Sequence, residues 1–288
     1  MSKRIKLILL IVLGIFAAIG LLFSAVFIAM QFGLLNVRGS ASERNAFFFG
    51  IASSSAPTAT ALPPQPCADA SLTTCGWNET PEWAVVAGGL EKDQQIIERV
   101  SAETGVNSRL IVSAVIPEQI RFFTSNREVF KRYFEPLKIL GSLSQFSLGV
   151  SGIKQETARA IERHARDATS PFYPGPSYAA PIEYPAGVDQ DAELYARLTD
   201  ADDHYYSYLY TALYIKEITA QWERAGFPID TRADIVVTLF NIGFERSNPN
   251  AAPVAAGAAI STGGTSYPFG VLGGLFFESS ELRDLFPA

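Results

Sequence analysis

The sequence predicts a mainly α-helical globular domain behind one N-terminal transmembrane helix. Residues 7–30 contain no charged side chain, and a helix of this length crosses a hydrocarbon core of about 30 Å. From residue 83 onward, apolar residues recur at helical spacing between turn signals. Strand patterns are scarce, because only residues 258–264 and the stretch 169–188 have the composition of short β segments.

The N-terminal part divides into a stub, an anchor and a tether. Residues 1–6 carry three Lys or Arg, so the positive-inside rule assigns them to the cytoplasm. Residues 7–35 are the expected anchor; a cleaved signal peptide is the alternative, although its apolar region is only about 7–15 residues long. Residues 36–82, rich in Ser, Ala and Pro, are typical of a tether. We therefore expect a single-pass protein of the inner, or cytoplasmic, membrane with residues 83–288 on the periplasmic or outer side.

The two cysteines and the net charge narrow the classes of partner. Cys67 and Cys75 lie in the tether, where an oxidising compartment favours a local disulfide, and two free thiols are the alternative. Neither of the two histidines has ligand spacing with the cysteines, so no metal site is expected. The net charge of −6 disfavours a nucleic-acid partner, which selects a basic face.

The expected helices follow one another from residue 90. The first covers residues 90–105 and stops at its terminal glycine. The second begins at Asn107 or Ser108, and Pro117 should kink or end it because proline lacks a backbone donor. Four further helices are expected, at residues 127–143, 154–168, 202–226 and 230–244.

Two of these helices carry additional signals. The helix at 154–168 is amphipathic, with Ala158, Ile161 and Ala165 on one face. The helix at 230–244 has a start that resembles a capping box, since Asp234 follows Thr231 by three residues. Between residues 169 and 188 lie five prolines and three tyrosines, and an ordered loop of this length is often functional.

The first stretch with chemical interest is the acid that follows the proline. A helix end at Pro117 would expose Glu118 and Gln119, and Phe122 shares the face of Glu118 if helical phase resumes. An aromatic wall excludes water, and a glutamic acid in such surroundings can protonate a glycosidic oxygen. A solvated surface Glu after a helix-ending proline is the alternative.

Two later stretches offer groups that can bind a ligand. In the turn SLGVSG, glycines permit close backbone approach and Ser147 and Ser151 can donate hydrogen bonds; an ordinary Gly/Ser connection is the alternative. In LFNIGF, Asn241 provides an amide beside the ring of Phe240, a combination that holds sugars. Here the alternative is a plain helix end with Gly243 as its cap.

The order of these stretches resembles that of the lytic transglycosylases of the lysozyme-like superfamily, relatives of the soluble lytic transglycosylases and of goose-type lysozymes. RLIVSAVIPEQ is similar to the motif whose apolar helix carries the catalytic glutamate, here Glu118. SLGVSGIKQETA is similar to Ser-x-Gly-x-x-Gln-Ile followed by a Thr-Ala helix start, and LFNIGF is similar to Tyr-Asn-Ala-Gly. The resemblance covers residues 90–288. This chain departs from the family at three positions: it has Gln119 where the family has Ser, Gly152 where the family has Gln, and Phe240 where the family has Tyr.

The resemblance implies a lysozyme-like fold, α+β with very little β, and a peptidoglycan lytic transglycosylase. The enzyme would cleave the β-1,4 bond between N-acetylmuramic acid and N-acetylglucosamine in glycan strands, with Glu118 as acid and then base and no cofactor. The C6 hydroxyl would attack in place of water and give a 1,6-anhydro sugar. The substrate-binding residues implied are Gln119, Phe122, Ser147, Gly149, Ser151, Phe240 and Asn241. We expect a groove at Glu118 with Ser147 and Asn241 in its walls and residues 169–188 along one edge.

Three other interpretations stay open. A degenerate lysozyme-like domain would bind glycan, or cell-wall or secretion machinery, without cutting, and Gly152 favours this alternative. Hydrolysis with two carboxylates would add Glu128, Glu135 or Glu156 as the second acid. A tethered interaction domain unrelated to glycan is the third.

Overall fold

The fold is mainly α-helical, as the sequence predicts. The computed structural model describes residues 74–124, 147–148, 150–200, 202–243 and 247–288, which belong to one unit of the chain, Ser40–Ala288. Within these ranges, no helix combines the length and the apolar character needed to cross a bilayer. The expected anchor at residues 7–35 lies outside them, and so does the helix expected at 127–143.

Eight α-helices and two short hairpins are described. The helices are α3 (Pro81–Lys92), α4 (Gln94–Thr104), α5 (Ser108–Thr124), α7 (Gln155–Arg166), α8 (Gln190–Thr199), α9 (Tyr205–Arg224), α10 (Ala233–Ile242) and α11 (Phe269–Glu278). The antiparallel hairpins are β1 (Ser147–Leu148) with β2 (Ile153–Lys154), and β3 (Ala259–Thr262) with β4 (Thr265–Pro268). Three 3₁₀ turns complete the set, η1 (Trp77–Glu79), η4 (Pro176–Tyr178) and η5 (Ala180–Ile182).

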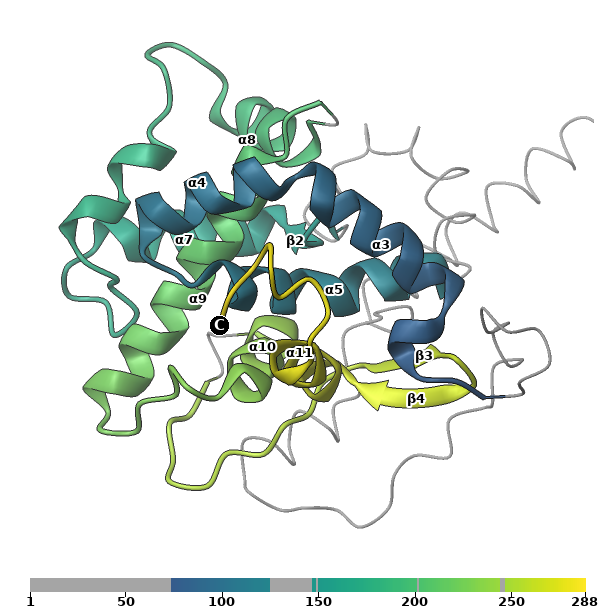
Figure 1. The fold of residues 1–288 in the computed structure, drawn as a ribbon. Coiled ribbons are helices and arrows are strands. Elements are labelled where there is room, and N and C mark those ends of the chain that lie inside the picture. Colours follow the sequence, from purple (N-terminus) through teal and green to yellow (C-terminus); the bar gives the residue numbers. More distant parts are fainter. Residues whose placement is uncertain (1–73, 125–146, 149, 201, 244–246) are drawn as a thin grey trace, which may run out of the picture. The chain divides into compact units, whose positions relative to one another are not determined.

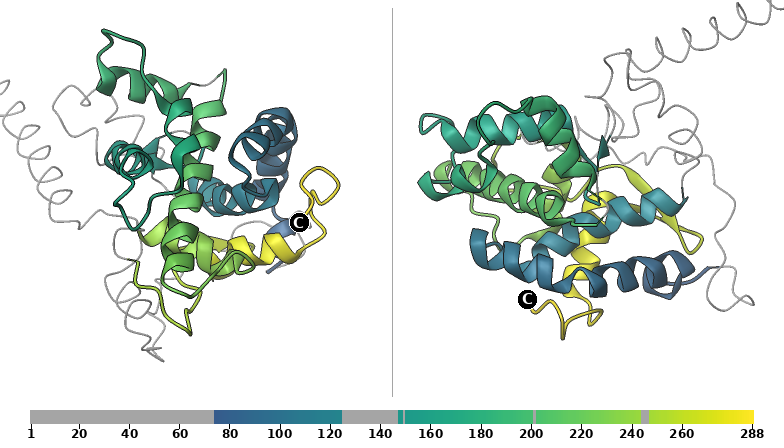
Figure 2. Two further views of the ribbon diagram at one scale, coloured as in Figure 1. Left: turned by 90° about the vertical axis from the view of Figure 1, so that its left-hand side faces the viewer. Right: turned by 90° about the horizontal axis from the view of Figure 1, so that it is seen from above.

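Helix α9 occupies the middle of this arrangement (Figures 1 and 2). It packs against α4, α5, α7, α8 and α10. Helix α5 in turn contacts α3 and α4 on one side and α10 and α11 on another, so it is enclosed by helices. This enclosure explains why α5 is apolar around most of its circumference rather than along one stripe.

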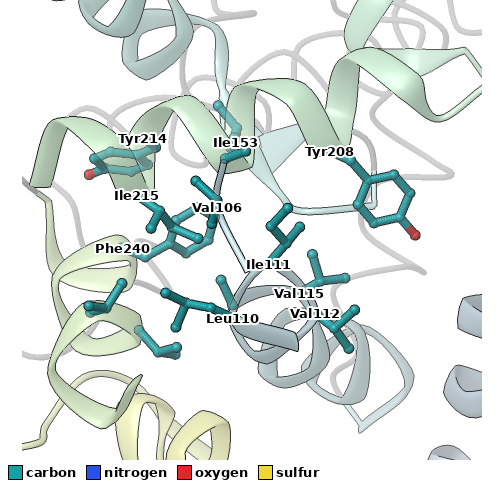
Figure 3. Close-up of a cluster of buried hydrophobic side chains, with 14 of the residues drawn as sticks. Val106, Leu110, Ile111, Val112, Val115, Ile153, Tyr208, Tyr214, Ile215 and Phe240 are labelled. Carbon is teal, nitrogen blue, oxygen red and sulfur yellow. The ribbon is translucent and has the colours of Figure 1, made fainter. Parts of the chain in front are cut away.

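A single apolar core joins α5, α9, α10 and the first hairpin. Figure 3 shows side chains from α5, among them Ile111 and Val115, facing residues of α9 such as Ile215. Ile153 of β2 reaches into the same cluster and is buried, which fixes the short hairpin against the helices. Burying an aliphatic side chain of this size contributes roughly 1.5–3 kcal/mol.

Several predicted helix ends are confirmed. Asn107 caps α5, because its Oδ1 accepts hydrogen bonds from the N–H groups of Arg109 and Leu110 at 2.8 and 3.2 Å. Gly105 ends α4 in the left-handed conformation, with φ of 64°. The predicted apolar face of α7 is buried as expected. Helix α10, by contrast, begins after Arg232 without a side-chain cap, so the capping box expected at Thr231 was wrong.

The expectation was that Pro117 would kink or end this helix; Pro117 does not end α5, which continues to Thr124 with the proline inside it. Because proline has no N–H, the carbonyl of Ser113 loses its partner in the helical ladder. Helix α11 packs against this point through Gly273, where an added Cβ would lie 2.7 Å from that carbonyl oxygen. Close packing of neighbouring helices thus keeps α5 intact through the proline.

Two short elements differ from the expectation drawn from sequence. The hairpin β1–β2 was not predicted, because two-residue strands show no alternating pattern. The stretch 169–188 forms the turns η4 and η5 instead of β segments. This loop is packed on the domain, since the Tyr178 hydroxyl donates to the Thr104 carbonyl at 3.0 Å.

The packed domain begins before residue 83. Trp77 and Trp83 are buried in the core, and their rings lie 5.0 Å apart in an edge-to-face arrangement beside Phe276. Tryptophan side chains bury a large apolar area, so two of them favour a packed segment. The Pro-rich composition of the preceding residues does not predict this packing. The boundary expected at residues 82 and 83 therefore moves toward the N-terminus by several residues.

The C-terminal segment wraps around one buried arginine. Arg109 of α5 donates hydrogen bonds of 2.6–3.1 Å to five main-chain carbonyls in the stretch from Phe276 to Phe286. Its guanidinium also lies 4.3 Å from the centre of the Phe276 ring. The charge is fully buried and satisfied by backbone dipoles, so it fixes the chain after α11 to α5.

Candidate functional site

Glu118 lies inside α5, six residues before the helix ends at Thr124. The side chain is almost buried, with 9% of the residue exposed, and it does not sit at a free helix end as expected. A carboxyl group in such a place needs a partner, because a buried charge without one is costly.

Arg121 provides that partner. Its Nη2 donates to both oxygens of Glu118, at 2.5 Å to Oε1, and both side chains are buried. The two residues are three positions apart on α5, which is the spacing of neighbours on one helix face. The three-residue spacing of Glu118 and Arg121 is compatible with an ion pair on a helix, but the prediction from the motif did not include this pair.

The hairpin β1–β2 covers the other side of Glu118. Gly152 has φ of +62°, and a methyl group there would lie 2.6 Å from Cγ and Cδ of Glu118. Only glycine allows so close an approach of backbone to the carboxyl side chain. Gln119 Nε2 donates to the carbonyl of Val150 in the same turn. Two predicted motifs, separated by about thirty residues in the sequence, therefore meet at this carboxylate.

Of the two serines predicted to bind substrate, Ser151 is instead engaged in a contact within the fold. Ser151 is buried, and its hydroxyl donates to the Ser207 carbonyl of α9 at 3.2 Å, so it serves the fold. Ser147 lies in β1, paired with Lys154 of β2. Its side chain, the whole of Gly149 and the side chain of Phe122 are outside what the structure describes. Their roles as substrate-binding groups stay predictions.

The Phe-Asn pair at the end of α10 is committed to packing. Phe240 is buried, with its ring 5.2 Å from that of Tyr214, and presents little surface to a ligand (Figure 3). Asn241 is 4% exposed, and its Oδ1 accepts a hydrogen bond from the Ala258 N–H at 2.9 Å. That contact fixes the chain entering β3, an element that packs against α5. Asn241 and Glu118 thus belong to neighbouring elements.

Other candidate groups are distributed as follows. Glu156 is exposed on α7 and lies 3.5 Å from Lys154, while Glu128 and Glu135 fall outside the described residues. The described part of the chain holds no cluster of three His, Cys, Asp or Glu suited to a metal ion. Cys75 is disulfide-bonded, and the only other cysteine in the sequence is Cys67. The groove expected at Glu118 stays a prediction, because residues 125–146, which follow α5, are not described.

A second buried carboxylate, which the sequence did not single out, belongs to Glu162 of α7. Its Oε1 accepts hydrogen bonds from the hydroxyls of Tyr210, at 2.6 Å, and Tyr184, and its Oε2 lies 2.7 Å from Arg159 Nη1. Burial and the hydrogen bond to Glu162 raise the pKa of Tyr184 to about 12. All partners of this carboxylate are fixed, so it organises α7, α9 and the loop that carries Tyr184.

The chain was compared with known proteins at three levels. No family model, no curated protein and no solved structure matches it.

Proposed function

We propose that this chain is a membrane-anchored lytic transglycosylase that cleaves the β-1,4 bond between N-acetylmuramic acid and N-acetylglucosamine in peptidoglycan. The observation that carries the proposal is the contact between Gly152 and Glu118. It brings the turn of the Ser-x-Gly motif against the acid of the first motif, as a site built from both requires. The mainly α architecture with a short hairpin between α5 and α7 supports a lysozyme-like fold for the domain.

The proposed reaction uses one carboxyl group twice. Glu118 donates its proton to the glycosidic oxygen while the bond from that oxygen to C1 of the muramoyl sugar breaks. The carboxylate then removes the proton of the C6 hydroxyl, whose oxygen bonds to C1 and closes the 1,6-anhydro ring. General acid–base catalysis of this kind contributes on the order of 10²–10⁴ in rate.

Arg121 has a different effect on each half of this cycle. Its guanidinium stabilises the carboxylate, which is the form that acts as base in the second step. Donation of a proton in the first step requires the ion pair to loosen when substrate binds. Arg121 is therefore a positioning residue for Glu118.

Digestion of purified sacculi tests the proposal. The full-length chain, in detergent, should release 1,6-anhydro muropeptides that mass spectrometry identifies, and Glu118→Gln should lower the rate at least about 100-fold. Glu223→Gln is the matched control, because Glu223 is an exposed carboxylate of α9 that belongs to none of the motifs. Equal digestion by the wild type and Glu118→Gln would refute the role of Glu118. Reducing muropeptides in place of anhydro products would indicate two-carboxylate hydrolysis.

The second candidate function is binding of glycan, or of cell-wall or secretion machinery, by a domain that does not cut. Three observations favour it: Glu118 is paired with Arg121, Gly152 replaces the amide of the family motif, and Asn241 holds the backbone. Gln119 lies next to Gly152 through its bond to Val150 and is the amide nearest that position among the described contacts. Pelleting with sacculi in the absence of any released muropeptide would support this function over cleavage.

A further inference from the structure

A polar hollow of about 460 Å³ opens between α7 and the start of α8. Arg159, Glu162, Arg163 and Arg166 form its α7 wall, and residues 189–191 form the opposite wall. The four α7 residues are spaced by three, one and three positions, so they share one helix face. None of them belongs to the motifs discussed above.

A network of hydrogen bonds around Glu162 lies at the hollow. Glu162 is 3% exposed and holds its two tyrosine hydroxyls and Arg159. Arg159 also reaches across to α8, where its Nη2 lies 2.7 Å from Asp191 Oδ1. One buried carboxylate and one bridging guanidinium thus fix the two walls relative to each other.

The rim carries charges of both signs that are available to a ligand. The side chain of Arg163 is exposed, and its guanidinium takes part in no hydrogen bond or ion pair among the residues that the structure describes. Arg166 donates to main-chain carbonyls and keeps its guanidinium 4.0 Å from Glu162 Oε2. Opposite, Asp189 caps α8 by accepting hydrogen bonds from the N–H groups of Asp191 and Ala192, and its side chain is exposed at the surface.

This mixture of charges selects the class of ligand. A simple anion would meet Asp189 and Asp191, and a simple cation would meet the arginines. A ligand that carries carboxylates and an amino group finds a complementary charge for each. Short peptides with free acidic and amino groups have this chemistry.

The hollow lies within reach of a substrate bound at Glu118. Helix α7 begins at Gln155, three residues after Gly152, and Arg163 is about 12 Å further along the helix axis. Gln155 Nε2 donates to the Asp191 carbonyl at 3.3 Å, which joins the first turn of α7 to the α8 wall. An extended peptide of four residues spans up to about 14 Å, enough to follow this path.

We infer that the hollow binds the peptide stem of peptidoglycan while the glycan strand lies at Glu118. The choice of this peptide rests on the proposed function, whereas the site itself is defined by its own charges. The carboxylates of the stem lie against Arg163 and Arg166, and its amino group lies against Asp189.

The test is direct binding of stem peptide that an amidase has released from sacculi. Calorimetry with the full-length chain should give a measurable Kd that weakens as salt is added. Arg163→Ala should weaken binding about fivefold, which corresponds to about 1 kcal/mol for an exposed ion pair. The substitution removes no hydrogen bond within the described residues, so the fold should be retained. Arg99→Ala on α4 is the matched control, because Arg99 is an exposed arginine outside the hollow.

The outcomes separate this inference from the proposed function. Binding of peptide by Glu118→Gln at the wild-type Kd supports the site whether or not the chain cuts glycan. An unchanged Kd in Arg163→Ala, or the absence of binding by a chain that digests sacculi, would overturn the inference alone. Equally tight binding of inorganic phosphate in competition with the peptide would also overturn it, because it would indicate a simple anion site.

Discussion

Glu118 is held from two sides, by an ion pair along its own helix and by the backbone of a distant turn. The guanidinium of Arg121 contacts both oxygens, and Gly152 lies against the carboxyl group and Cγ of the side chain. A buried acid with so little freedom is already oriented before a ligand arrives. Orientation of this kind reduces the entropic cost of reaching a reactive geometry.

Gly152→Ala should lower the free energy of unfolding by more than the cost of placing alanine at a positive φ. The positive φ costs alanine roughly 1 kcal/mol, and the clash with Glu118 should add roughly 1–3 kcal/mol. Gly226→Ala is the matched control: it has φ of +82°, and an added Cβ would meet nothing within 4 Å. Urea denaturation compares the two variants, and equal losses of stability would contradict the close contact at Gly152.

Glu217 of α9 is a buried acid of another kind. It is fully buried, and neither oxygen has a hydrogen-bond partner within the described residues. Burial raises its pKa to about 10, so the group is neutral at pH 7. Gln221, one turn further along α9, has a buried Oε1 that also lacks a donor there, and a protonated Glu217 can supply one.

This pKa makes stability depend on pH. Between pH 4.5 and about pH 10 the folded chain keeps a proton that the unfolded chain releases, so stability is complete below pH 4.5 and falls as pH rises. From pH 4.5 to pH 7 the loss is on the order of 3 kcal/mol. Glu217→Gln should remove this dependence and raise the melting temperature at pH 7. Parallel pH profiles for the wild type and Glu217→Gln, measured beside the exposed control Glu223→Gln, would contradict a neutral Glu217.

Among the elements, α5 departs furthest from expectation. A proline within a helix removes a hydrogen bond and kinks or ends the helix, and the local sequence did not decide between these two outcomes at Pro117. The reason lies in α11, whose Gly273 packs at the carbonyl that the proline leaves without a partner. Such compensation comes from residues about 150 positions away and cannot be read from local sequence.

The link between α5 and the C-terminal segment should be a main determinant of stability. Arg109→Met should lower the free energy of unfolding by at least about 3 kcal/mol, because several charge-assisted hydrogen bonds are lost together and five carbonyls stay buried. Hydrogen exchange should accelerate in α11 before it does in α7.

Arg283→Met is the control for this prediction. Arg283 also donates to carbonyls of the same segment, but it is exposed, so its loss should cost about 1 kcal/mol or less. Similar losses in the free energy of unfolding from both substitutions would contradict the prediction that the buried Arg109 contributes more than the exposed Arg283.

At the scale of the whole molecule, sequence predicted the elements better than their contacts. The apolar period of α7 and the glycine after α4 identified helices correctly, because these signals are local. The position of Phe240 and Asn241 in the core was not predicted, since an aromatic and an amide at a helix end serve packing and binding equally well. The meeting of Glu118 with Gly152 followed only from the order of the motifs, and the hollow beside α7 followed from no motif at all.

The five carbonyls that accept hydrogen bonds from Arg109 affect when the chain can fold during its synthesis. A ribosome releases the residues after α11 long after it has released α5, so the guanidinium has none of its five acceptors during most of synthesis. Until that stretch emerges, α5 carries an uncompensated cation in a core that would otherwise close. Completion of the domain is thus coupled to the arrival of residues 276–286, and chains that stop short of them leave a charged gap beside the helix that bears Glu118.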